Sequence, residues 1–134
     1  MSTAVELQTM IFDRLTADAG VTALVDGRIY DRMPSDADYP CITFGPTDMS
    51  PADMDCIDGR YETIQIDCWA VDHGRMRPAK EIADAVKASL HFYDGDMLNG
   101  ALTELAVESV RVMIDADGIT AHGIVVVTAL IEEA

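Results

Sequence analysis

The segment from Thr120 to Ile131 is apolar at nearly every position, and this run constrains the fold more than any other feature of the sequence. A strand that is apolar on both faces is typical of the centre of a sheet, where both faces are covered. Asp117 and Gly118 precede it and form a strong two-residue hairpin signal, because glycine accepts the positive φ that such turns need. A partner strand is predicted before this turn, over residues 109–114, where apolar side chains alternate with Ser, Arg and Met.

Two more strands are predicted in the middle of the chain. The segment from Tyr61 to Val71 alternates with a period of two, which indicates a half-buried strand. One predicted face carries Ile64, Ile66, Cys68 and Ala70, and the other carries Gln65, Asp67 and Trp69. A shorter strand is predicted from Cys41 to Gly45.

The N-terminal segment has the pattern of an amphipathic helix. Thr3 and Glu6 have the spacing of a capping box, and Gly20 is predicted to end the helix. The apolar stripe recurs every fourth residue, at Leu7, Ile11 and Leu15. Residues 21–27 are then expected to form a short helical turn, and residues 28–33 a brief extended piece.

A second helix is predicted to begin near Pro78, since proline is favoured in the first helical turn. Its apolar stripe is Ile82, Val86 and Leu90, with Ala79 and Ala83 beside it. The predicted order is α-β-β-α-β-β in one domain, residues 1–134. We therefore expect an α/β (α+β) fold, in which a mainly antiparallel four-stranded sheet carries two helices packed on one face.

Residues 46–59 are expected to form a long acidic loop, because they contain two prolines and no apolar periodicity. Loops of this length are usually functional or disordered. Flexible methionine side chains suit adaptable protein contacts, so the loop is a candidate partner-binding segment. The candidate contact residues are Asp48, Met49, Asp53, Met54, Asp55 and Asp58. The alternative is a loop that is merely mobile.

The net charge excludes several classes of partner. Nine basic and 24 acidic residues give a formal charge of −15. Nucleic-acid binding depends on Lys and Arg replacing phosphate counterions, so sequence-specific binding is not expected. An anionic membrane surface would repel the chain, and no apolar run approaches a membrane-spanning length. The charge fits either a solvated surface or a surface past which DNA slides. The chain is expected to be made in the cytoplasm.

No catalytic or metal-binding motif stands out, so the protein is not expected to be an enzyme or to hold a cofactor. The acidic segments lack the ligand spacing of a calcium-binding EF-hand loop. The histidines and cysteines show no zinc-ligand spacing. These residues are His73, His91, His122, Cys41, Cys56 and Cys68. His122 is interpreted as a sheet residue, Cys41 and Cys68 as core residues, and Cys56 as an exposed thiol.

Three stretches together resemble the tail-completion, or tail-terminator, proteins of long-tailed phages, prophages and gene transfer agents. The first is LQTMIFDRLTADAGVTALVDGRIYDRMP, followed closely by YPCITFG. The second is ETIQIDCWAVDHGRMRPAKEIADAVKASL, and the third is RVMIDADGITAHGIVVVTALIE. They cover nearly the whole chain in the expected order.

The resemblance implies an assembly protein of the virion tail or neck, built in the cytoplasm of a host bacterium. Such a protomer would close as a homo-oligomeric ring, a hexamer, on the head-proximal end of the tail tube. Its expected partners are the tail tube protein and a head-completion or neck protein. The alternatives are a neighbouring neck protein (head-completion or stopper), a small acidic enzyme, and an inhibitor that mimics DNA.

The charges leave two arrangements of such a ring open. Uniformly spread negative charge would make the copies repel one another. Alternatively, basic residues would lie at the subunit contact against the acids of a neighbour. The candidates for that contact are Arg60, Arg75, Arg77 and Arg111.

Overall fold

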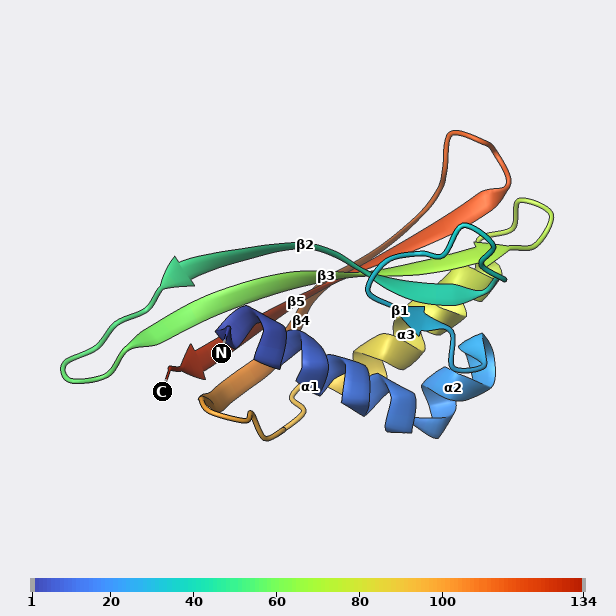
Figure 1. The fold of residues 1–134 in the computed structure, drawn as a ribbon. Helices are drawn as coiled ribbons and strands as arrows, with labels where there is room; N and C mark the ends of the chain where they lie inside the picture. Colours follow the sequence, from blue (N-terminus) through green and yellow to red (C-terminus); the bar gives the residue numbers. More distant parts are fainter. Residues whose placement is uncertain (1, 134) are drawn as a thin grey trace.

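The structure is a computed structural model that describes residues 2–133. It is an α+β fold in which a five-stranded sheet has the order β1-β2-β3-β5-β4. Three helices lie together along one side of this sheet (Figure 1). The elements are α1 (Thr3–Ala17), α2 (Ala19–Val25), β1 (Ile29–Tyr30), β2 (Cys41–Pro51), β3 (Gly59–Val71), α3 (Arg77–Leu90), β4 (Ala101–Ile114) and β5 (Thr120–Glu132).

The α+β class is confirmed, but the prediction of four strands and two helices is wrong in detail. The helical turn after α1 is a helix of its own, α2, and the extended piece after it contains the two-residue strand β1. β1 runs parallel to β2, with Ile29 opposite Ile42, so the sheet is mixed. A strand of two residues is too short to show a period-two pattern, so the sequence does not predict β1.

β5 occupies the interior position that its apolar run predicts. It pairs with β3 along one edge and with β4 along the other, antiparallel to both. Its odd-numbered side chains from residue 121 to residue 131 are buried beneath the helices, and its even-numbered ones from 122 to 130 are half-buried on the open face. The cover on that second face is therefore incomplete within a single protomer.

The turn between β4 and β5 lies where Asp117 and Gly118 predict it, but it is longer than two residues. The strands end at Ile114 and resume at Thr120, and Gly118 has a φ of 74°. β4 is also longer than predicted and begins at Ala101. Two register shifts, between residues 102 and 104 and between 107 and 109, break its alternation and hide its first half in the sequence.

The first helix is capped differently from the prediction. Ser2, not Thr3, is the N-cap, and its hydroxyl accepts a hydrogen bond from the Val5 amide at 3.3 Å. The carboxylate of Glu6 instead accepts the Asn99 amide at 2.6 Å. Gly20 does not end the helix, since Asp18 ends α1.

Asp18 also begins α2, because its side chain accepts hydrogen bonds from the amides of Gly20 and Val21. One aspartate therefore serves as the C-cap residue of α1 and as the side-chain N-cap of α2. This arrangement accounts for the change of direction between the two helices.

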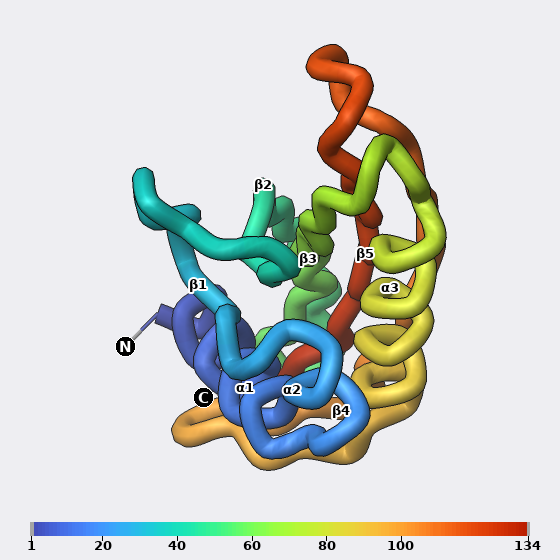
Figure 2. The backbone as a smooth tube through the Cα atoms, turned by 90° about the vertical axis from the view of Figure 1, so that its right-hand side faces the viewer, coloured from blue at the N-terminus to red at the C-terminus, as the bar shows by residue number. Residues whose placement is uncertain are grey.

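α3 packs directly on β5 at Gly123, and Figure 2 shows the helix running beside this strand. A Cβ atom at Gly123 would lie 3.3 Å from the Ala79 carbonyl oxygen and 3.5 Å from the Ala83 Cβ. Small residues on both sides thus let the helix pack directly against the strand. The two alanines that the sequence places beside the stripe of α3 are both completely buried.

This close packing predicts a position-specific cost for a larger side chain on α3. Ala83→Leu adds volume where the helix meets Gly123, so we expect a loss of about 1–3 kcal/mol in the free energy of unfolding. Ala88→Leu is the matched control, because Ala88 is exposed on the same helix. It should change stability by less than about 0.5 kcal/mol. Equal effects of the two variants in urea denaturation would contradict this packing.

Candidate functional site

Residues 46–59 form a projecting β-hairpin end, here called the acidic arm, and not the long loop that the sequence predicts. β2 continues to Pro51, and its residues 47–51 pair with residues 60–64 of β3. In Figure 1 these paired strands extend beyond the helices to a tip at the left of the view. Only residues 52–58 connect the two strands.

The sequence does not predict the strands of the arm because no helix covers them. A strand shows alternating apolar and polar residues when one of its faces is buried. Residues 46–51 are exposed whichever side of the strand they occupy, so their sequence carries no such alternation. A register shift between Phe44 and Thr47 further separates this segment from the buried start of β2.

The tip of the arm is hydrogen-bonded. Met54 and Ile57 exchange backbone hydrogen bonds of 2.9 and 3.0 Å, and Cys56 between them has a φ of 63°. The Asp53 carboxylate accepts the Gly59 amide at 3.2 Å. These bonds close a small turn at the end of the hairpin.

All six candidate contact residues are exposed and belong to the arm. Asp48 and Met49 are consecutive on β2 and so point to opposite faces of the hairpin. Asp53, Met54, Asp55 and Asp58 lie in the connection between the strands. Met54 is 69% exposed, and together with Ile57 it leaves an apolar patch at an otherwise acidic tip. The arrangement suits contact with another protein.

A partly buried charged cluster lies beside the 52–58 connection of the arm, where Arg60 is opposite Pro51. The guanidinium of Arg60 contacts the Glu133 carboxylate and, at 3.3 Å, the Glu62 carboxylate. Only 2% of Glu62 is exposed, and burial raises the pKa of its carboxyl above the usual value, although Arg60 opposes the shift. The Glu133 amide also donates to the Asp58 carbonyl at 2.7 Å. These contacts tie the arm to the end of β5.

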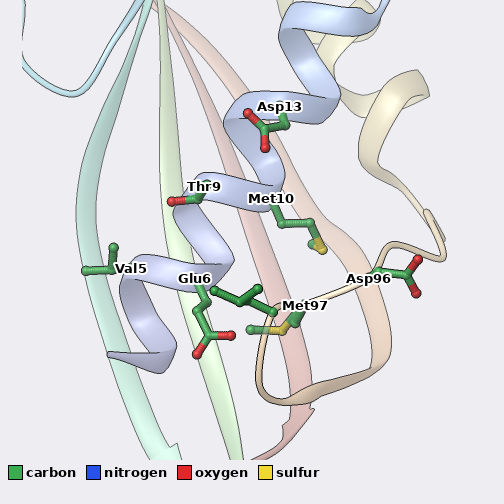
Figure 3. Close-up of a pocket in the computed structure, with 8 residues that line it drawn as sticks. Val5, Glu6, Thr9, Met10, Asp13, Asp96 and Met97 are labelled. Carbon is green, nitrogen blue, oxygen red and sulfur yellow. The ribbon is translucent and has the colours of Figure 1, made fainter. Parts of the chain in front are cut away.

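A second surface feature is a groove of about 480 Å³ between α1 and residues 96–98, here called the α1 groove. Figure 3 shows Met10 extending from α1 toward the segment that carries Met97. Its rim carries Asp13 on α1 and Asp96 on the facing segment. A smaller depression with the same two aspartates continues it toward Tyr93. The groove joins an apolar floor to an acidic rim, and no pattern in the sequence predicts it.

The open face of the sheet carries a hydrogen-bond network that links three strands. Asp67 accepts hydrogen bonds from Gln65 at 2.8 Å and from the Nε2 of His122 at 2.7 Å. The His122 ring stacks on Trp69 with 3.8 Å between centroids, and Trp69 Nε1 donates to the Thr43 hydroxyl at 2.9 Å. His122 is therefore a sheet residue, as the sequence indicates.

An aspartate–histidine pair also occurs in catalytic triads, where it activates a nucleophile within hydrogen-bond reach. Here the hydroxyl in the network, that of Thr43, accepts from Trp69, and the His122 Nε2 bonds to Asp67. Neither Asp67 nor His122 lines the α1 groove or the other depressions described. The network joins β2, β3 and β5, so the pair of Asp67 and His122 serves to hold these strands together.

The cysteines lie where the sequence places them: Cys41 and Cys68 are buried and Cys56 is exposed. Burial raises the thiol pKa of both Cys41 and Cys68, which lowers their reactivity. Within residues 2–133, no group of three or more His, Cys, Asp or Glu side chains is placed to hold a metal ion. In the same part of the chain, no helix has the length and apolar character that crossing a membrane requires.

Comparisons with known proteins agree on one kind of protein. The family model described as tail completion protein gp17 matches residues 9–132. A chain in the virion of a native gene transfer agent particle is 25% identical, with a TM-score of 0.89 and 98% of each chain covered. The gp17 protein of bacteriophage SPP1 is 19% identical with a TM-score of 0.62, over 94% of this chain and 88% of that one. No curated protein sequence matches.

The buried Glu62 predicts a pH-dependent cost. The pKa of its carboxyl is raised in the folded protein above the ordinary value of 4.5. The contribution of this group to the free energy of unfolding is therefore full at pH values below 4.5, and it is lost as the pH rises through the pKa of the folded state. Glu62→Gln stays neutral and avoids this loss. We expect the free energy of unfolding of the variant, relative to that of the wild type, to increase as pH rises from about 5 to about 8.

Urea denaturation at several pH values would measure this difference. Glu81→Gln removes one charge from a half-exposed carboxylate on α3 and is the matched control. A Glu62→Gln difference that stayed constant with pH, or that favoured the wild type increasingly, would show that burial does not raise the pKa of this group.

Proposed function

The chain belongs to the tail completion protein gp17 family, and from this premise we propose that it closes the head-proximal end of a phage-like tail tube as a ring. The ring stops growth of the tube and presents the surface to which the filled head joins. The chain is a structural component of a virion and not an enzyme, in agreement with the description of its family.

The observation that carries this proposal is the extent of the structural match. The similarity to the chain from the gene transfer agent virion covers 98% of both chains at a TM-score of 0.89. A protomer with the same fold over nearly its whole length supports a place in the same kind of particle. The family match over residues 9–132 assigns that fold to tail completion independently.

The protomer has projecting segments at both ends of its sheet, which supports a role in assembly and not in catalysis. A ring needs protomers with free surfaces at two ends and loops that reach the adjoining layers. The acidic arm extends from one end of the sheet and the β4–β5 turn from the other (Figure 1). The charge of −15 also suits a ring around a DNA path, because a phosphate backbone does not bind to an acidic surface.

Within this proposal, the acidic arm contacts an adjoining layer of the particle, either the tail tube protein or a head-completion protein. Met54 and Ile57 supply the apolar area, and the aspartates Asp53, Asp55 and Asp58 surround it. Interfaces typically gain affinity from a few apolar side chains enclosed by a polar rim. The runner-up is a neck protein one layer away, which would also use such an arm.

The first test is removal of the protein from the strain that produces the particle. We expect tail tubes of irregular length and heads that remain unjoined, because nothing then stops tube growth or forms the joint. Electron microscopy measures both. Tails of uniform length with unjoined heads would favour the neck-protein alternative, and normal joined particles would refute both functions.

The second test addresses the arm alone. Met54→Ser with Ile57→Ser removes the apolar patch at the tip, so we expect binding to the adjoining layer to weaken about tenfold or more. The fraction of head-joined or uniformly terminated tails should fall accordingly in complemented particles. Phe92→Ser is the matched control, since Phe92 is 65% exposed and lies outside both the arm and the β4–β5 turn. Equal particle yields from both variants would remove the arm from the account.

A further inference from the structure

The α1 groove has a charge and shape that define what it can receive. Its floor is apolar, with Met10 and Met97, and Leu98 at its edge is 75% exposed. Asp13 and Asp96 are the two exposed carboxylates that line it, since Glu6 is buried and bonded to the Asn99 amide (Figure 3). The groove therefore fits an apolar side chain that has positive charges on either side.

One segment of this same chain has that composition. Residues 75–80, RMRPAK, contain three of the nine basic residues. Met76 is 38% exposed, and the side chains of Arg75 and Arg77 beside it are 67% and 87% exposed. Their partners within the protomer are Asp72 at 3.7 Å and Glu81 at 3.2 Å, both at least 40% exposed. Ion pairs this exposed are weak and exchange readily for others.

We propose that the α1 groove binds residues 75–77 of a second copy of the chain, with Met76 in the apolar floor and the two arginines against Asp13 and Asp96. This contact rests on the proposed ring and names the surfaces that close it.

The position of the two surfaces in the fold supports this occupant. The groove lies beside the first half of α1, whereas residues 75–77 lie at the start of α3, at the opposite end of the molecule (Figure 1). A contact between opposite ends is heterologous: each copy uses one surface for one neighbour and the other surface for the next. Repetition of such a contact generates a closed ring when the rotation per copy allows closure.

Three other arginines of the chain already have partners within the protomer. Arg60 is held by Glu62 and Glu133 beside the 52–58 connection. Arg28 donates to the Pro40 carbonyl at 2.8 Å. Arg14 belongs to the groove end itself, where its guanidinium lies 4.2 Å above the Tyr93 ring. Arg32, Lys87 and Arg111 are also exposed, but each stands alone in the sequence, whereas residues 75–77 place an exposed apolar side chain between two accessible arginines.

Charge reversal tests the pairing in the purified full-length protein. Arg75→Glu with Arg77→Glu, and separately Asp13→Arg with Asp96→Arg, should each weaken self-association about tenfold or more in sedimentation. The variant with all four changes should recover association, because the signs are again complementary. Asp84→Arg, an exposed reversal on α3, is the control for net charge. Failure of the fourfold variant to exceed both double variants would overturn the pairing.

Disulfide trapping tests the contact in assembled particles. In a Cys56→Ser background, Met76→Cys with Leu98→Cys should give a ladder of cross-linked species above the dimer under mild oxidation. Each single cysteine variant should stop at the dimer, since it provides one reactive site per copy. Particles that contain the double variant and yield no species above the dimer would refute the contact.

The two proposals fail in different ways. If removal of the protein leaves tails and joints normal while the ladder still forms, the tail-capping function fails and the subunit contact stands. If tails lengthen without the protein but the ladder is missing, the function stands and the ring closes through other surfaces.

Discussion

The close contact of α3 with β5 at Gly123 is the interaction on which the rest of the structure depends. Because Gly123, Ala79 and Ala83 leave no side-chain bulk between helix and strand, the helices bury one face of β5 completely. All helical cover is concentrated there. The opposite face of the sheet, the two long hairpins and the outer side of α1 consequently remain free, and an assembly protein contacts its partners through free surfaces.

A hydrogen-bond network and an ion-pair cluster stabilise the parts of the sheet that no helix covers. The network of Asp67, His122, Trp69 and Thr43 joins β2, β3 and β5 on the open face, where no helix packs. The cluster of Arg60, Glu62 and Glu133 anchors the arm. Burial of Glu62 at this position opposes its ionisation, and its partner Arg60 offsets part of that cost. The strands of the arm therefore continue the sheet.

The sequence predicted those parts of the fold in which one face is buried against another. The stripes of α1 and α3, the alternation of β3 and the apolar run of β5 all reflect burial, and these elements lie where expected. β1, the first half of β4 and the end of β2 were missed. They are very short, interrupted by register shifts, or exposed on both faces, so burial left no period in their sequence.

The candidate site was predicted only in part, for the same reason. Acidic composition and methionines marked the arm correctly as an exposed segment, without its hairpin geometry. The α1 groove was not predictable, because it arises from segments that are far apart in the sequence, Val5–Asp13 and Asp96–Leu98. Only their tertiary packing brings these together, through contacts such as the Asn99 amide with Glu6.

The central claim is that this protein forms the layer between tail tube and head. Averaged electron-microscopic density of the finished particle, compared with particles in which the protein carries a terminal fusion of known size, measures its position directly. The account predicts extra density in a ring at the head-proximal end of the tube. Extra density at the distal tip or inside the head, or loss of the protein from finished particles, would contradict it.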